Sequence, residues 1–223
     1  MTTRAQQARV VAALVLVPAG AGTVTMEEHN MPDREETLHG YVTDMLALEQ
    51  HIHKAVRGQL EAVDTEQPEV IHHLRHIQSY VERHIELLKE LDEKIDAGGK
   101  IGEAVKRAGS IVAGLGAAAI DLVRTEKLPK NLRDDYTAAS LAYVGYIMLF
   151  TTASAFEDHD TARLAATCLG DYAQVLTTLQ DLIPSAVVFE LRTQGFNVFE
   201  EAASEASVRV EGIWQNVGEG GAA

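Results

Sequence analysis

Apolar residues recur at steps of three and four along most of this chain, a spacing that predicts long amphipathic helices. A first helix is expected to begin at Pro32, with acids in its first turn, and to end before a turn at 64–68. A second is expected from about Glu69 to Asp96. Their apolar faces comprise Leu38, Tyr41, Val42, Met45, Leu48, Ile52, Val56 and Leu60, and Val70, Leu74, Ile77, Val81, Ile85, Leu88, Leu91 and Ile95.

The second half of the chain continues this pattern. Residues 101–124 are rich in Gly and Ala and predict a short helical hairpin, with a loop after it at 125–131. A third long helix is expected within 136–156. Asp160 is the expected N-cap of a fourth, which Pro184 breaks or restarts before it ends near Gly195.

Residues 136–156 carry no charged side chain and are long enough to cross a bilayer. They are also rich in Ala, Ser and Thr, and their flanks are mainly acidic rather than basic. A central bundle helix is apolar all round for a different reason, because other helices surround it. We therefore expect a core helix without stable membrane insertion.

Two helical hairpins joined by a connection of about 35 residues predict an all-α, up-down four-helix bundle. The extra short hairpin lies in the crossover between the second and third long helices. The expected organisation is an extension at 1–30, the bundle at 31–195, and a last helix within 196–223 that ends in a disordered tail at 218–223.

The N-terminal extension has two interpretations. Arg4 and Arg9 precede the apolar run at 10–22, as in a secretory signal, which would mean export. Alternatively, translation starts at Met26 or Met31. We expect a cytoplasmic location, with export if the signal is genuine.

Charge and cysteine content narrow the function. The net charge of −14 repels phosphate backbones, which argues against nucleic acid as a partner. Cys168 is the single cysteine, so no intramolecular disulfide forms.

Three stretches resemble the bacterial stress-induced ferritin-like proteins over about residues 36–193: "LALEQHIHKAV", "HLRHIQSYVERHIELLKELDEKI" and the segment from "DDYTAASLAY" to "QDLIP". The resemblance implies a four-helix bundle with one long crossover. It also implies two iron or manganese ions, held by a Glu from each of two helices and a Glu-x-x-His pair from each of the others.

When the family's metal ligands are matched to this sequence residue by residue, few of them are retained. Glu49 matches the first-helix glutamate and His84 the second-helix histidine, and Asp171 is the acid of the fourth helix. The other ligand positions hold Val81, Ala142 and Gln174. The resemblance therefore implies a degenerate member of the family.

Glu49 and Asp171 both fall on apolar stripes, where a carboxylate needs hydrogen bonds, a charged partner or a metal. One interpretation is a structural network with His84 and the phenol of Tyr143 or Tyr146. The other is a mononuclear metal site of Glu49, His84 and Asp171.

Histidines near these acids add weaker candidates. His53 lies one turn after Glu49 and could share its metal, whereas His51 should face solvent. On the second helix a stripe beside the core face could bind a transition metal or titrate near neutral pH, but is more typical of a solvated or interface face. It comprises His73, His76, Tyr80 and His84.

We expect a non-catalytic structural or partner-binding bundle linked to stress response, without a cofactor and self-associating, with a dimer as the first expectation. The alternative is an iron- or manganese-binding oxidase, peroxidase or storage protein. Its metal ligands would be Glu49, His84 and Asp171, together with His53.

Overall fold

A computed structural model describes residues 33–62, 68–96 and 128–220, and these contain helices and no strands. The helices are α2 (Arg34–Ala62), α3 (Pro68–Asp96), α5 (Leu128–Ala155), α6 (His159–Thr193) and α7 (Ala202–Gly220). The expected all-α class is thus confirmed for this part of the chain. The extension at 1–30 and the short hairpin at 101–124 lie outside the described residues.

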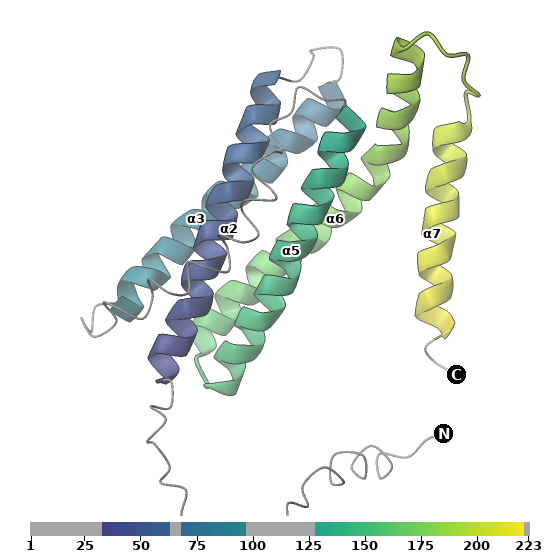
Figure 1. Cartoon of the computed structure of the whole chain (residues 1–223). Coiled ribbons are helices and arrows are strands. Elements are labelled where there is room, and N and C mark those ends of the chain that lie inside the picture. Colours follow the sequence, from purple (N-terminus) through teal and green to yellow (C-terminus); the bar gives the residue numbers. More distant parts are fainter. Residues whose placement is uncertain (1–32, 63–67, 97–127, 221–223) are drawn as a thin grey trace, which may run out of the picture. The chain divides into compact units, whose positions relative to one another are not determined.

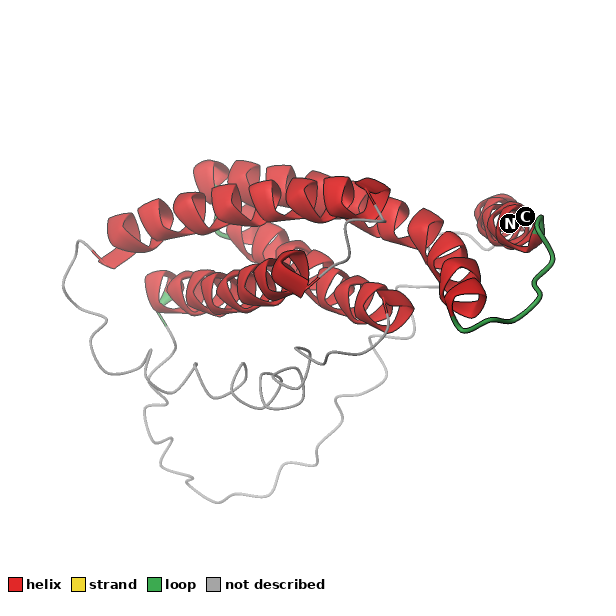
Figure 2. Cartoon of the chain, turned by 90° about the horizontal axis from the view of Figure 1, so that it is seen from above, coloured by secondary structure: helices red, strands yellow, loops and turns green. Residues whose placement is uncertain are grey.

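Helices α2, α3, α5 and α6 pack side by side as a bundle (Figures 1 and 2), and each pair in contact runs antiparallel. Side-chain hydrogen bonds show these directions, because in each pair of helices a later residue of one meets an earlier residue of the other. Between α2 and α3 the bonded pairs are Thr43–Asp92 and His53–Glu82. Between α2 and α5 they are Glu49–Tyr146 and Gln59–Asp135, and between α3 and α6 they are Tyr80–Gln174 and His84–Asp171. Since α3 and α5 are both antiparallel to α2, the two helix ends that residues 97–127 connect lie at opposite ends of the bundle.

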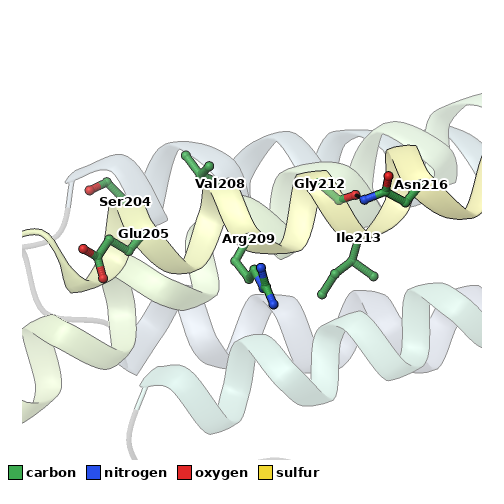
Figure 3. A pocket seen from close by; sticks show the side chains of 7 residues that line it. All are labelled: Ser204, Glu205, Val208, Arg209, Gly212, Ile213 and Asn216. Atoms are coloured by element: carbon green, nitrogen blue, oxygen red, sulfur yellow. Dashed lines mark hydrogen bonds between the residues drawn. The ribbon is translucent and has the colours of Figure 1, made fainter.

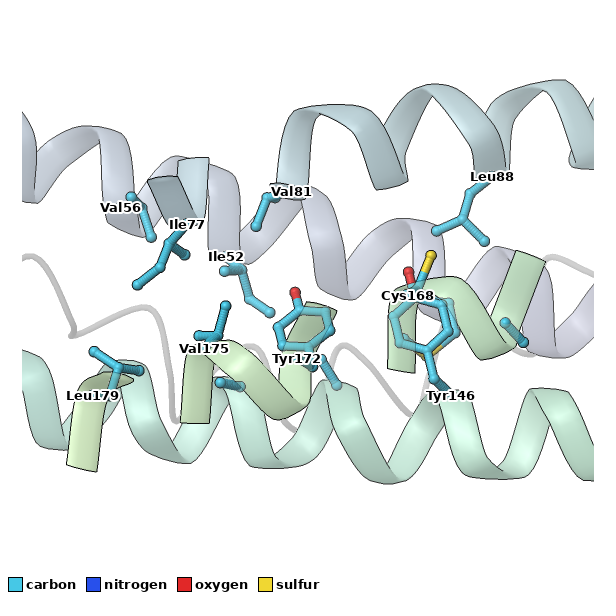
Figure 4. Close-up of a cluster of buried hydrophobic side chains, with 14 of the residues drawn as sticks. Ile52, Val56, Ile77, Val81, Leu88, Tyr146, Cys168, Tyr172, Val175 and Leu179 are labelled. Carbon is cyan, nitrogen blue, oxygen red and sulfur yellow. The ribbon is translucent and has the colours of Figure 1, made fainter. Parts of the chain in front are cut away.

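The core lies between these four helices and combines large side chains from α2 and α3 with small ones from α5. Ala139, Ala142 and Ala153 of α5 are buried, and Gly145 leaves room for the side chain of Met45 on α2. Figure 4 shows Tyr146 of α5 and Tyr172 of α6 projecting into this core. The small residues bring α5 close enough for Tyr146 to reach Glu49 of α2.

Helix boundaries differ from the expectation at three points. Residues 128–131 were expected in a loop but belong to the first turn of α5, where Pro129 is tolerated because its missing N–H needs no partner. Asp158, not Asp160, caps α6, and its carboxylate accepts from the backbone N–H of Thr161. Pro184 lies within α6 without interrupting it.

The C-terminal part of the chain follows the expected order. Gly195, with φ of +84°, follows Gln194, the C-cap of α6, in a conformation that favours glycine. Helix α7 packs on α6 and continues to Gly220, so residues 218–220 are helical where a disordered tail was expected.

Candidate functional site

Glu49 of α2 is fully buried, and both of its carboxylate oxygens are hydrogen-bonded. Its Oε1 accepts from the hydroxyl of Tyr146 at 2.6 Å and lies 3.0 Å from Nδ1 of His84. Its Oε2 accepts from the hydroxyl of Tyr172 at 2.8 Å. Three donors from three other helices therefore compensate for the loss of water around this carboxylate.

His84 of α3 lies between two carboxylates. Its Nε2 is 2.9 Å from Oδ2 of Asp171, while its Nδ1 faces Glu49. Burial alone would lower the pKa of His84, but the neighbouring Cys168, the hydrogen bond to Glu49 and the charge of Glu49 outweigh it and raise the pKa to about 10. The ring is therefore an imidazolium at neutral pH, and both of its N–H groups donate to carboxylates.

The two tyrosines act as neutral donors. Burial, followed by the charge of Glu49, raises the pKa of Tyr146 far above its usual value, and the same causes raise the pKa of Tyr172. Their rings lie 5.9 Å apart and flank the imidazole of His84 at 5.8 and 5.5 Å. The phenols keep their protons over the physiological pH range, and each donates one hydrogen bond to Glu49 from an uncharged hydroxyl.

Asp171 connects the network to the protein surface. Its side chain is 14% exposed and forms an ion pair with Arg83, whose side chain is 48% exposed. The two carboxylates of Glu49 and Asp171 are thus matched by His84 and Arg83. We call Glu49, His84, Tyr146, Tyr172, Asp171 and Arg83 the buried network; its formal charges sum to zero, which reduces the cost of placing them in the bundle.

The sequence-predicted candidates divide into two groups. Glu49, His84 and Asp171 come together as one network, and Tyr146, rather than Tyr143, supplies the expected phenol. His53 is separate, since its Nε2 lies 3.1 Å from Oε1 of Glu82 at the surface.

Two histidines lie elsewhere than expected. His84 is fully buried, although its stripe was predicted to run beside the core, because it lies three residues after Val81 and four before Leu88, which are both buried on the core face of α3. His51 was expected in water but is half-buried, and its Nε2 is buried without a hydrogen-bond partner among the described residues.

Two members of the network were not found from the sequence. Tyr172 lies four residues after Cys168 and three before Val175, a spacing that places it at the centre of the buried face of α6. This signal is present in the sequence, but the prediction placed the neighbouring Asp171 on the apolar stripe. Arg83 gave no signal in the sequence, because an arginine at an exposed position of a helix is ordinary.

The residues do not fit the two-metal site that the resemblance implies. Val81 and Ala142 are buried apolar residues, and Gln174 is exposed and accepts from the hydroxyl of Tyr80. Both ring nitrogens of His84 face carboxylates, with Nδ1 3.0 Å from Glu49 and Nε2 2.9 Å from Asp171, so a metal bound at either nitrogen would have to replace one of these contacts. Within the described residues, no three His, Cys, Asp or Glu side chains are arranged to hold a metal ion.

A second buried polar pair joins α2 and α5. Gln59 donates from Nε2 to Oδ1 of Asp135 at 2.7 Å. Burial raises the pKa of Asp135 to about 7, against the opposing effect of this hydrogen bond. Oε1 of Gln59 and Oδ2 of Asp135 are both buried acceptors without a partner, so a proton on Oδ2 would give the pair the donor it lacks.

One hollow is found along α7 (Figure 3), with a volume of about 560 Å³. Its lining is mixed and comprises Ser204, Glu205, Val208, Arg209, Gly212, Ile213 and Asn216. None of these residues belongs to the buried network. The hollow has no pair of groups suited to acid–base or nucleophilic chemistry.

No protein-family model, curated protein or solved structure matches this chain.

Proposed function

We propose that this protein is a non-catalytic helical bundle of ferritin-like ancestry that acts through its surface, as a structural or partner-binding protein. The proposal extends to the link with bacterial stress response that the sequence resemblance implies. The antiparallel hairpins and the long connection between α3 and α5 agree with a ferritin-like topology. Chemistry in the interior would instead require a free coordination position or a reactive group that substrate could reach.

The state of His84 supports this proposal most directly. Both of its ring nitrogens are bound to carboxylates, and its raised pKa keeps it protonated. Both carboxylate oxygens of Glu49 are occupied, because they face three donors, on His84, Tyr146 and Tyr172. The ring of His84 thus lies between two acids, and in its protonated form it neutralises them without a metal ion.

The rival function is an iron or manganese protein, and one observation favours it. His84 is already in contact with both Glu49 and Asp171, so loss of its ring protons would leave one imidazole and two carboxylates, which suit these metals, close together. Metal binding would then have to displace the protons of His84 and the phenol hydrogen bonds.

Metal content distinguishes the two functions. The full chain is purified without affinity tag or chelator, incubated with Fe²⁺ or Mn²⁺ without oxygen, desalted, and measured by elemental mass spectrometry. Wild type, Glu49→Ala and the control Glu86→Gln, which changes an exposed acid of α3, are compared. We expect equal, substoichiometric metal in all three. Near-stoichiometric metal in wild type and Glu86→Gln that is lost in Glu49→Ala would establish the rival function.

A further inference from the structure

Helix α5 carries larger apolar side chains on its outside than on its inside. Toward the core it places mainly Ala139, Ala142, Tyr146, Leu149 and Ala153. On the outside, between 39% and 51% of the surface of five large apolar residues is exposed, and we call these residues the outer face of α5: Leu141, Val144, Ile147, Met148 and Phe150. A helix whose only partner was this bundle would place its large residues inward.

The outer face is also unusual in charge. The chain carries a net charge of −14, yet no charged residue lies between Tyr136 and Phe156. With about 1.5 Å per residue, this uncharged length of helix extends for roughly 30 Å. Surfaces of this kind are typical of contacts with a protein or a membrane.

The exposed area agrees with a protein contact. At roughly 190 Å² for a fully exposed large apolar residue, the five exposed fractions correspond to about 400 Å², as large as the largest apolar patch of a typical monomer. Burying these residues on both copies would remove about 800 Å² of apolar surface from water, and the small residues between them would add to this area. The total approaches the roughly 1,200 Å² at which stable interfaces begin.

We infer that the outer face of α5 is the contact between two copies of this chain, with their α5 helices packed antiparallel about a two-fold axis. The inference rests on the proposed function, because a bundle without interior chemistry must act through a surface. A second copy suits the face because two strongly acidic chains repel each other, and this uncharged surface lets them approach without pairing acid against acid.

The antiparallel arrangement predicts specific contacts. An axis near the middle of the uncharged stretch, level with Tyr146, brings Val144 of one copy against Met148 of the other, and the reverse contact forms by symmetry. Both residues are about half exposed in the single chain. Substitutions at these two positions therefore act twice in each dimer.

The test uses light scattering and sedimentation of the full chain. Wild type should have twice the 24.2 kDa mass of one chain at micromolar concentration. Val144→Glu with Met148→Glu should weaken association about 100-fold or more, through four acids at one contact, and Val144→Lys with Met148→Lys should do the same. An equal mixture of the acidic and basic variants should regain the doubled mass.

Two controls keep the test specific. Val208→Glu with Ile213→Glu makes the same change at exposed apolar positions of α7 and should leave the mass doubled. Circular dichroism should show equal helix content in every variant, since all the changed side chains are exposed.

Three results would overturn the inference. These are a monomeric wild type at micromolar concentration, an acidic variant that still forms dimers, and a wild type that floats with neutral phosphatidylcholine vesicles through the same face. The last result would assign α5, which is long and apolar enough to cross a membrane, to a lipid surface. Because mass and metal content are measured separately, failure of the dimer would leave the test of the proposed function intact.

Discussion

Glu49→Gln is the sharpest test of the buried network, because it changes charge with almost no change in volume. The amide retains one oxygen, which can accept from Tyr146 and His84 at its present Oε1 position. Its nitrogen then faces the hydroxyl of Tyr172, whose proton loses its acceptor and whose oxygen accepts from the amide instead. The substitution therefore removes the charge that faces His84 and leaves the proton of Tyr172 without an acceptor, and it leaves no cavity.

The size of the effect can be bounded from His84. The difference between its pKa of about 10 in the protein and its usual 6.5 corresponds to at most about 5 kcal/mol of stabilisation of the charged ring. Glu49 shares this effect with other groups. Breaking one partner of a buried ion pair typically costs about 3–5 kcal/mol. Because His84 can release its proton when Glu49 is neutral, we expect a loss of about 3 kcal/mol in the free energy of unfolding.

Urea unfolding at pH 7, followed by circular dichroism at one fixed protein concentration, measures this loss. Glu82→Gln is the matched control. It removes the same charge from an exposed acid that faces His53, and should change stability by less than about 0.5 kcal/mol. A loss below about 1 kcal/mol in Glu49→Gln would refute the reasoning, since it would mean that the carboxylate of Glu49 is not charged in the folded protein.

Three further predictions concern pH and the phenols. Since folding raises the pKa of His84 to about 10, the contribution of its protonated ring to the free energy of unfolding is complete below pH 6.5 and is lost as pH rises through 10. Thermal unfolding from pH 7 to 10.5 should show this decline in stability, and His84→Gln should make the decline smaller. Folding also raises the pKa of Asp135 to about 7, so stability falls by up to about 4 kcal/mol between pH 4 and 7. Asp135→Asn, which keeps a donor for Gln59, should match wild type near pH 4 and exceed it at pH 8; a less stable variant at pH 8 would contradict this. Tyr172→Phe should cost about 1–2 kcal/mol in urea unfolding, because Oε2 of Glu49 loses its partner, and no change would place that oxygen in contact with water.

Much of the fold was predictable because each long helix has a regular apolar stripe. The end of α3 at Asp96 was predicted from the glycines that follow it. The start of α5 was not, because "KLPKN" has the composition of a loop, and a helix there is favoured by the burial of Leu132 and the hydrogen bond of Asp135 to Gln59 of α2. Local sequence carries no information on such a contact.

The candidate site was predictable in its acids and not in its arrangement. An acid on an apolar stripe is visible in one helix, so Glu49 could be singled out. The position of His84 between two acids depends on how α3 is rotated against α2 and α6, and a rotation of one residue decides whether Tyr172 or Asp171 points inward. A single sequence defines each stripe to within about one residue, which is too coarse to predict which side chains meet.

The buried network also explains why one helix can present two such different faces. Glu49 takes donors from α3, α5 and α6, so one carboxylate fixes the rotation of every helix in the bundle. For α5 this contact is made by Tyr146, and most of the other residues that α5 places in the core are small, such as Ala139, Ala142 and Ala153. Once Tyr146 sets the rotation, the large apolar residues on the opposite side of α5 are held outward, although burial would favour turning them in. The polar contact at Glu49 in this way keeps the outer face of α5 exposed.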